Sequence, residues 1–380
     1  MTSSVPLVTI RDPQKRDPSR SHLLGMLPEE VAEFCRSLDE PAYRGDQLLQ
    51  WVYARNVSNF SEMLNLSKAF RAQLAANAAV FSGVVAQTTR AADGTHKLLV
   101  SFDGATVESV WIPEADRDTA CISSQVGCPV GCKFCASGLD GVERNLTAGE
   151  IVEQVMRVRD VVRRAKADPQ SRVTNIVFMG MGEPLANYEQ VIRALRIINH
   201  EKALAIGARR ITISTVGLPA QIRKLAAENL QVNLALSLHA PEDQLRRELI
   251  PWGKVPIVDL IAACRDYFDK TGREITLEYI LLRGINMDAA AARALAKIAK
   301  SLRCNLNLLR YNPVPGLPFE RPSAEESFAF QERLRSAGVN AHMRRSRGSD
   351  IDAACGQLRR AAQSPAAVAD HPEQERDKNG

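Results

Sequence analysis

The chain contains no apolar run long enough to cross a membrane, and no apolar segment of the kind that opens a secreted precursor. Both absences argue against a membrane-spanning or exported protein, and we expect a cytoplasmic one. Its eight cysteines occur partly in one cluster and partly as scattered single residues. Because no secretory signal accompanies them, this pattern favours reduced thiols over a disulfide framework.

The chain also has little net charge, because 49 Lys and Arg stand against 44 Asp and Glu, which gives a formal +5. This balance is only a mild indication of a polyanionic partner. A length of 380 residues predicts roughly two domains. Residues 1–21 are polar and dotted with proline, and residues 361–380 are rich in alanine, proline and charge. We predict that both ends are disordered.

Residues 22–80 are predicted to form a helical accessory domain. Apolar residues recur at helical spacing over residues 28–38 and 43–55, and a third helix is predicted over residues 67–77, with Ser67 as its N-cap. Basic residues decorate these helices. From the residues alone, a scaffold on the main domain is the simpler interpretation, and an RNA-contacting appendage is the functional alternative.

Residues 81–115 alternate between apolar and polar side chains, which predicts a β-extension. Its three short strands are expected over residues 84–90, 96–102 and 106–112, with Asp-Gly turns between them. Glu108 falls inside the third strand. Taken alone, it would be an ordinary solvent-facing strand residue.

From residue 116 to about residue 360 the pattern becomes strand, loop and helix in turn. Six such units predict a parallel sheet wrapped by helices, an α/β fold, and a seventh strand is predicted over residues 340–345. Thr147 and Glu150 form a capping-box pattern at the start of one helix. The six strands are predicted over residues 120–124, 175–179, 210–215, 232–238, 275–282 and 305–310, and the other helices over residues 188–201, 218–228, 258–270, 288–302 and 324–337.

A cysteine cluster follows the first of these strands. Cys128, Cys132 and Cys135 are spaced C-x3-C-x2-C on a loop punctuated by glycine and proline. Three thiolates on a tight loop suit a [4Fe–4S] cluster with one open iron. A closed zinc site with Cys121 as the fourth ligand is the main alternative, and ordinary thiols are a third. The gap of seven residues and the strand-like run after Cys121 favour the cluster.

Polar and glycine residues mark the predicted carboxyl ends of the following strands, which is where barrel active sites form. Gly182 lets the backbone approach a ligand closely, and Glu183 offers an acceptor for an ammonium group. Each residue alone is ordinary, since a strand-end serine is usually a cap and a lone histidine is usually structural. The remaining members of this rim are Ser214, Ser237, Leu238, His239 and Asn312.

A single cysteine, Cys355, lies between small residues in the segment DAACGQ. The small neighbours leave room for a substrate, although a lone cysteine is most often a buried, inert thiol. The preceding basic residues are predicted to favour its thiolate, which is the nucleophilic form. These residues are Arg344, Arg345 and Arg347, and they are also the best candidates for contact with RNA.

Five stretches, CISSQVGC, GMGEPLANYE, LSLHAP, YNPVPG and GSDIDAACGQL, together resemble the RlmN family of radical S-adenosylmethionine (SAM) enzymes, over nearly the whole chain. The resemblance implies a partial (β/α)6 radical-SAM barrel with an N-terminal helical accessory domain and a small β-hairpin region. It implies that Cys128, Cys132 and Cys135 hold a [4Fe–4S] cluster. It also implies that Gly182 and Glu183 meet the amino group of SAM, and that the other rim residues are further SAM contacts.

The resemblance implies an activity as well. The expected enzyme methylates C2 of an adenosine in the peptidyl-transferase centre of 23S ribosomal RNA and of one next to the anticodon of transfer RNA, using two SAM molecules per turnover. Cys355 is expected to carry the methyl group as S-methylcysteine, and Cys121 to resolve the adduct through a transient disulfide. Glu108 is the implied proton acceptor. The expected partners are the two RNAs and an electron donor such as flavodoxin or ferredoxin, and the enzyme is expected to be a monomer.

Two alternatives remain at this point. A sister family methylates C8 of adenine in ribosomal RNA through the same cysteines, although the helical segment YRGDQLLQWVY looks more like the C2 family. A zinc-stabilised RNA-binding module without activity is the alternative from another class, and it predicts a colourless protein instead of a brown one. The cluster loop also departs from the family pattern by a proline after Cys128, in CPVGC, which spares every ligand.

Overall fold

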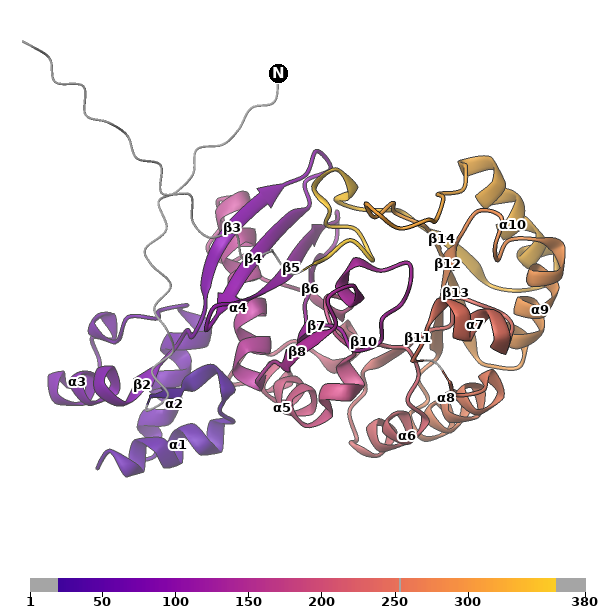
Figure 1. Ribbon diagram of the computed structural model, residues 1–380. Coiled ribbons are helices and arrows are strands. Elements are labelled where there is room, and N and C mark those ends of the chain that lie inside the picture. The colour runs from indigo at the N-terminus through magenta and orange to yellow at the C-terminus, as the bar shows by residue number, and fades with distance from the viewer. Residues whose placement is uncertain (1–19, 253, 360–380) are drawn as a thin grey trace, which may run out of the picture.

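A computed structural model describes residues 20–252 and 254–359 of the chain (Figure 1). Its centre is a ten-stranded sheet with the strand order β14-β13-β12-β11-β10-β9-β6-β5-β4-β3. Helices pack along the outside of the curved sheet, and a helical module lies beside its antiparallel end. The α/β barrel architecture expected from the sequence is confirmed.

Seven strands form the parallel part of the sheet, as the strand–helix alternation predicts. All seven begin within two residues of their predicted starts, because turn residues bound each one. They are β6 (Asp118–Cys121), β9 (Asn175–Phe178), β10 (Ile211–Thr215), β11 (Asn233–Ser237), β12 (Ile275–Leu281), β13 (Cys304–Arg310) and β14 (Ala341–Arg344).

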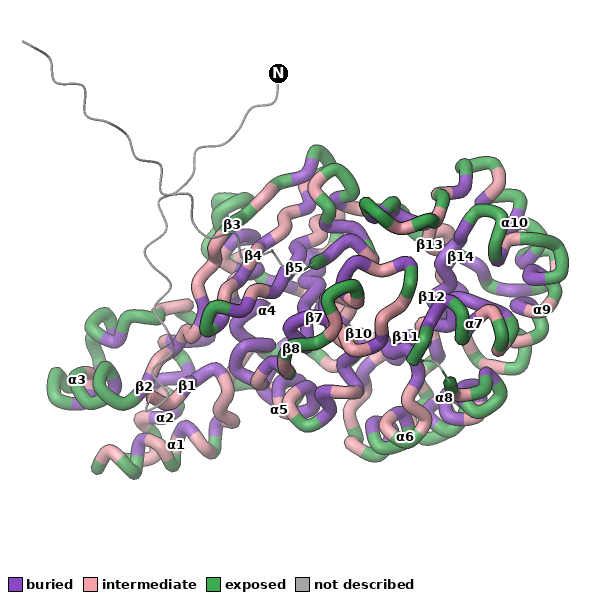
Figure 2. Tube along the Cα trace, viewed as in Figure 1, coloured by how far each residue is buried: buried purple, intermediate pink, exposed green. Residues whose placement is uncertain are grey.

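The helices of the barrel follow from sequence-local signals. Thr147 Oγ1 accepts from the backbone N–H of Glu150 at 3.2 Å, and the Glu150 carboxylate accepts from the N–H of Thr147 at 2.8 Å, so the predicted capping box forms. The apolar stripes of these helices face the sheet, as the buried core shows (Figure 2). The helices are α4 (Ala148–Lys166), α5 (Tyr188–Asn199), α6 (Pro219–Ala227), α7 (Asp243–Leu249), α8 (Ile257–Thr271), α9 (Ala289–Lys300) and α10 (Ala324–Ser336).

The β-extension is continuous with the barrel sheet. Its strands β3 (Val84–Arg90), β4 (His96–Phe102) and β5 (Ala105–Pro113) pair in antiparallel fashion. Strand β5 then pairs with β6, with Val110 opposite Cys121. The extension therefore shares a hydrogen-bonded edge with the first barrel strand, and its position relative to the barrel is fixed by the ladder.

The accessory domain contains the three expected helices, α1 (Pro28–Ser37), α2 (Tyr43–Leu49) and α3 (Lys68–Asn77). Ser67 caps α3 by accepting from the N–H of Phe70 at 3.1 Å. The second predicted helix changes to a π-turn over Gln50–Ala54. A short parallel ladder between β1 (Ser21–His22) and β2 (Ala78–Ala79) closes the domain.

The segments predicted to be disordered lie almost entirely outside the described residues. Arg20 and Ser21 are exceptions, because Ser21 pairs with Ala78 and the Arg20 guanidinium donates to the carbonyl of the same residue at 2.6 Å. The prediction of disorder is therefore wrong at these two residues. In the described part of the chain, no helix combines the length and apolar character that a membrane crossing requires.

Two elements were not predicted from the sequence. A small hairpin forms between β7 (Gln125–Gly127) and β8 (Val142–Asn145), on either side of the cysteine loop. The short helix α7 packs against that loop, because the N–H of Lys133 donates to the carbonyl of Leu249 at 2.9 Å. Both elements are too short to give a periodic signal, and both are stabilised by contacts with the loop.

Candidate active site

The predicted rim residues meet at the carboxyl ends of the parallel strands. A cavity of about 170 Å³ is lined by the three cluster cysteines and by most of the predicted SAM contacts. Leu238 is the exception, because its side chain is fully buried in the core and it does not line the cavity. The lining includes Cys128, Cys132, Cys135, Gly182, Glu183, Ser214, Ser237, His239, Asn312 and Cys355.

The cysteine loop is shaped by glycine. Gly127 has a φ of +79°, and a Cβ placed on it would lie 2.0 Å from the carbonyl oxygen of Gly141. That carbonyl accepts from the N–H of Cys128 at 2.9 Å. A side chain at position 127 would therefore displace the strand that fixes the first cysteine.

The three thiols form a donor set that fits an iron–sulfur cluster. Burial raises the pKa of the Cys128 thiol to about 12 and the pKa of Cys132 and Cys135 above the ordinary value. Three such thiols become thiolates when a polycationic group offsets their charge. Among the described residues, no three His, Cys, Asp or Glu side chains form a group that could hold a single metal ion.

The glycine-rich segment after β9 packs directly on the backbone after β6. Gly182 has a φ of +103°, and a Cβ there would lie 2.8 Å from the backbone N of Gln125. The Glu183 carboxylate is buried and accepts from the N–H groups of Leu185 at 3.0 Å and Val216 at 2.8 Å. Burial raises the pKa of Glu183 to about 7, in spite of these two donors. An ammonium group in the cavity would offset the free-energy cost of burying the ionised carboxylate, so Glu183 is a suitable partner for the amino group of SAM.

Further acceptors face the same cavity. Ser214 Oγ and Ser237 Oγ, at the ends of β10 and β11, lie 3.3 Å apart. Asn312 donates from Nδ2 to the carbonyl of Cys355 at 3.2 Å, whereas its buried Oδ1 has no hydrogen-bond partner among the described residues. A buried acceptor without a hydrogen-bond donor costs free energy. Asn312 Oδ1 can therefore accept a hydrogen bond from a polar ligand in the cavity.

His239 is held as a neutral acceptor. Its backbone is left-handed, with a φ of +58°, and its Nδ1 accepts from the N–H of Ile280 at 3.1 Å. Its ring stacks edge-on against Phe134 of the cysteine loop, with ring centroids 5.0 Å apart. Burial lowers the pKa of His239 from 6.5 to about 3, and the cationic Arg246 adds to this effect. The imidazole is therefore uncharged at neutral pH.

This shift predicts a pH-dependent stability. Between pH 6.5 and 3 the unfolded chain binds a proton at this position and the folded chain does not. The free energy of unfolding should therefore fall by about 1.4 kcal/mol per pH unit as the pH drops below this upper value. The free energy of unfolding can be measured with urea at pH 7.5 and at pH 5.5. Its decrease between these two pH values should be about 1.4 kcal/mol smaller for His239→Gln than for the parent. His342→Gln, at an exposed position of β14, is the control. Equal losses in the parent and His239→Gln would contradict the assignment.

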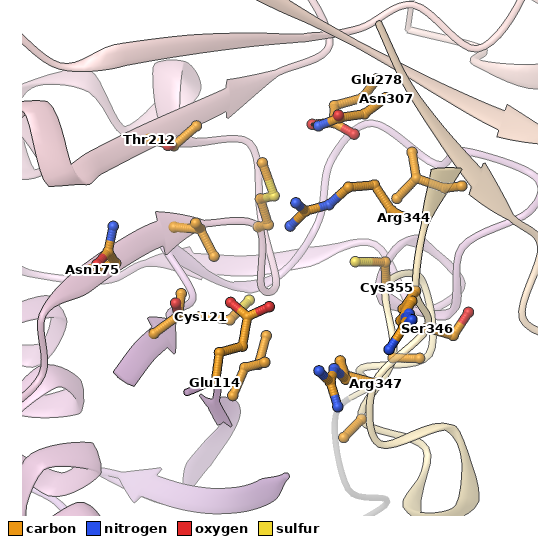
Figure 3. Close-up of a pocket in the computed structure, with 18 of the residues that line it drawn as sticks. Glu114, Cys121, Asn175, Thr212, Glu278, Asn307, Arg344, Ser346, Arg347 and Cys355 are labelled. Carbon is orange, nitrogen blue, oxygen red and sulfur yellow. The ribbon is translucent and has the colours of Figure 1, made fainter. Parts of the chain in front are cut away.

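A second, larger cavity of about 430 Å³ adjoins the first (Figure 3). Cys355 lines both cavities, and Cys121, at the end of β6, lines only the larger one. The Cys355 sulfur and the Arg344 guanidinium point into the larger cavity, and Cys121 and Glu114 lie on its opposite side. The two cysteines, which are 234 residues apart in the sequence, thus face one space.

The charge state of Cys355 differs from the sequence-based prediction. Cys355 is exposed to solvent, but desolvation by the protein around it raises the pKa of its thiol to about 11, and the negative charge of Glu278 adds to the rise. Arg344 favours the thiolate, as predicted, but does not outweigh these two effects, so the thiol is protonated at neutral pH. Burial also raises the pKa of Cys121, and the neighbouring Cys355 contributes. All eight cysteines are free thiols in this structure, and the implied Cys121–Cys355 disulfide is not formed.

The segment that carries Cys355 is fixed to the cysteine loop and to the residues that follow β13. We call residues 345–359 the Cys355 loop. The N–H of Ala136 donates to the carbonyl of Gly356 at 2.7 Å, and Ser137 Oγ donates to the carbonyl of Leu358 at 2.6 Å. These bonds place Cys355 directly beside the proposed cluster ligands.

Glu108 has a different position from the one its predicted role requires. It lines neither cavity, and its buried carboxylate forms a 2.9 Å ion pair with Lys97 Nζ. The carboxylate also accepts from the N–H of Arg359 at 2.9 Å, and Lys97 donates to the carbonyl of Asp352 at 3.2 Å. Burial raises the pKa of Glu108 although Lys97 opposes the rise. In this structure Glu108 anchors the Cys355 loop to the β-extension.

Glu278 is a site residue that the sequence reasoning missed. It lies on β12, lines both cavities with Cys355, and accepts from Asn307 Nδ2 at 2.9 Å. Burial raises the pKa of its carboxyl. The one available signal was a charged residue within the apolar run ITLEYIL, because buried strands rarely tolerate a carboxylate without a function.

Comparison with known proteins identifies the family. Residues 21–80 match the ribosomal RNA large subunit methyltransferase N-terminal domain, and residues 122–295 match the radical SAM superfamily. The chain is 45% identical over 359 residues to a probable dual-specificity RNA methyltransferase RlmN from Rhodopirellula baltica, across 94% of this chain and 95% of that protein. The chain belongs to the RlmN family. The RlmN protein of Syntrophobacter fumaroxidans is 48% identical over 332 residues, which cover 87% of this chain and 95% of that one.

A solved structure agrees with this assignment. The crystal structure of a radical SAM methyltransferase from Sphaerobacter thermophilus superposes with a TM-score of 0.86 and 44% identity, and covers 89% of this chain and 99% of that one. Membership of the RlmN family confirms the predicted family, fold class and enzyme class. The radical SAM family also implies a [4Fe–4S] cluster and SAM as cofactors.

Proposed function

We propose that this RlmN-family protein methylates C2 of adenosine in 23S ribosomal RNA and in transfer RNA. The observation that carries the proposal is the position of Cys355 at the junction of two cavities, one lined by the cysteine triplet and the other by Cys121 and arginines. A thiol at that junction can receive a carbon from one side and pass it to a base on the other. The names of the RlmN relatives, dual-specificity RNA methyltransferases, support both substrates.

The smaller cavity holds the cofactors in this proposal. Cys128, Cys132 and Cys135 would bind the [4Fe–4S] cluster, and the rim residues would bind SAM, with Leu238 contributing through its backbone. Glu183 would pair with the amino group of SAM, and Asn312 Oδ1 would accept a polar hydrogen. When bound, the cluster and two SAM molecules per turnover supply a methyl group and the radical chemistry that an unactivated aromatic carbon requires.

The protein's own residues act on the carbon and on protons. Cys355 loses its thiol proton as it takes the methyl group and becomes S-methylcysteine, and the raised pKa means that this proton must be drawn off during the transfer. Once the carbon carried by Cys355 is bonded to C2 of the adenine, the Cys121 thiol loses its proton and attacks the Cys355 sulfur. The bond between that sulfur and the carbon breaks, its electron pair moves to the base, and the RNA leaves. A transient Cys121–Cys355 disulfide remains, and a thiol reductant would return it to two thiols. The two free thiols in the structure are the starting form for this step.

Glu108 would accept the final proton only after a movement of the Cys355 loop. In the present arrangement its carboxylate contacts Lys97 and the backbone of Arg359 and faces neither cavity. Release of the Arg359 bond would free one carboxylate oxygen toward the larger cavity. We therefore propose that the loop closes and opens in each turnover.

The remaining partners follow from the chemistry. A one-electron donor such as flavodoxin or ferredoxin would reduce the cluster, and the enzyme would work as a monomer in the cytoplasm, where low-potential donors are available. Target adenosines must leave their stack to reach the larger cavity, as in other enzymes that modify bases.

The test is a methylation assay with base mapping. Protein purified without oxygen should be brown and should contain iron and sulfide. With SAM, a reductant and either a 23S fragment or a transfer RNA, it should yield 2-methyladenosine, as identified by mass spectrometry. Formation of 8-methyladenosine would favour the sister activity, and a colourless protein with about one zinc would overturn the proposal.

A further inference from the structure

A third cavity, of about 350 Å³, leads away from the active site across the sheet edge. It lies between the end of β14 and the first turns of α10. It shares Arg310, Arg344 and Arg345 with the larger cavity, whereas none of the cluster cysteines lines it. An extended ligand that starts beside Cys355 can therefore continue into this space without meeting the cofactor cavity.

The third cavity is strongly basic. Arg321 joins the three shared arginines, and no acidic residue lines the space. Within residues 20–252 and 254–359, none of these four arginines forms a salt bridge. The first turn of α10 carries two carboxylates, Glu325 and Glu326, and neither lines the space. Glu326 pairs with Arg283 at 3.0 Å and caps its own helix. The charge of Arg344 is partly offset by Glu114 and Glu278 in the larger cavity, whereas no carboxylate lines the third cavity beside Arg310, Arg321 and Arg345.

Two of these arginines are positioned by neutral groups. Arg310 donates from Nε and Nη2 to the carbonyl of Pro322, at 3.2 and 2.8 Å. Arg321 donates from Nη2 to Ser346 Oγ at 3.3 Å, and its buried Nε has no partner among the described residues. Burial, and to a smaller extent the positive charge of the nearby Arg310, lower the pKa of Arg321. An anion here would relieve that repulsion and satisfy the idle donor.

An aromatic side chain stands at the rim of the same cavity. Phe328 on α10 is 55% exposed and is the only aromatic residue among those that line the space. An exposed ring beside several guanidinium groups provides a face for base stacking next to a phosphate site. A simple phosphate or an acidic peptide would use the arginines but would gain nothing from the ring.

We propose that the third cavity binds the nucleotide next to the target adenosine, with its phosphate on Arg321 and Arg345 and its base against Phe328. This subsite rests on the proposed function, because it assumes an RNA adenosine in the larger cavity. It also gives a reason for recognition of a single-stranded target, since a neighbour that remains stacked in a duplex cannot reach the ring.

Equilibrium binding of RNA hairpins with an adenosine-containing loop tests the subsite. Phe328→Ala should weaken binding by about tenfold, the usual loss when one stacking ring is removed. Two further hairpins carry an abasic residue, one on the 5′ side and one on the 3′ side of the adenosine. The parent protein should bind one of these two hairpins about tenfold more weakly than the intact hairpin and the other one normally. For the more weakly bound hairpin, Phe328→Ala should cause no further loss of affinity. Arg321→Ala should lower the slope of log affinity against log salt by about 0.7.

The controls use residues of similar exposure outside the cavity. Arg333→Ala, at the other end of α10, and Val258→Ala, which is 71% exposed on α8, should bind RNA as the parent does. Arg345→Ala repeats the charge test at an exposed position, in case Arg321→Ala does not fold.

Two results would overturn the subsite. One is equal weakening of Phe328→Ala on normal and abasic probes. The other is tighter RNA binding after removal of residues 360–380, together with no effect of Phe328→Ala on RNA binding. That result would indicate that the acidic end of the chain, and not RNA, occupies the cavity. If the parent protein binds the hairpins but methylates neither RNA, the proposed function is refuted. The effect of Phe328→Ala on intact and abasic hairpins can still be compared in that case, because it is a binding measurement.

Discussion

Cys355→Ala is expected to abolish RNA methylation, by more than about 10⁴-fold, the order of loss when a covalent nucleophile is removed. The reason is positional, because Cys355 is the cysteine that lines both the cofactor cavity and the arginine-lined cavity. Among the described residues, no other cysteine lines both cavities, so no other thiol can accept a carbon in the cofactor cavity and transfer it to a base in the larger cavity. The measurement is product formation on RNA under reducing, oxygen-free conditions, followed by mass spectrometry.

The same variant should keep its cofactors. Cys355 contacts the cysteine loop through its neighbours' backbone, since Ala136 bonds the carbonyl of Gly356. Iron content and SAM binding should therefore match those of the parent. Cys304→Ala, a half-buried thiol at the start of β13, is the matched control and should methylate normally. Parent-like methylation by Cys355→Ala would refute the covalent route.

Gly127→Ala is expected to remove most of the iron from the purified protein. The residue has a φ of +79°, and the new Cβ would lie 2.0 Å from the Gly141 carbonyl oxygen, which is backbone and cannot rotate away. Strands β7 and β8 would have to separate, and the N–H of Cys128 would lose its 2.9 Å bond to that carbonyl. Iron and sulfide analysis, together with the visible absorption of the protein, measures the result.

Gly131→Ala is the matched control for this substitution. Gly131 lies in the same loop and also has a positive φ, +65°, but a Cβ there would meet nothing within 4 Å. Both variants carry the backbone strain of a left-handed alanine, on the order of 1 kcal/mol. Only Gly127→Ala adds the collision. Equal iron content in the two variants would show that the β7–β8 contact does not shape the ligand loop.

Local patterns in the sequence were sufficient for much of the fold. Strand–helix alternation, the Thr147 capping box, the Ser67 cap and the Asp-Gly turns depend on residues within a few positions of one another, and all of them form as predicted. The hairpin around the cysteine loop and the short helix α7 gave no such signal. They are held by contacts with segments that lie far apart in the sequence, as in the bond from Lys133 to Leu249.

The sequence by itself determined the family, the barrel and most of the residues at its rim, because motif spacing and strand-end positions are local properties. The tertiary structure alone decided how these residues behave. Whether Cys355 is a thiol or a thiolate depends on burial and on Glu278 as well as on Arg344, and these come from different strands and loops. Only the folded chain shows that Glu108 faces Lys97 and the Cys355 loop rather than a cavity. Burial and charge are sums over neighbours in space, and a sequence does not list those neighbours.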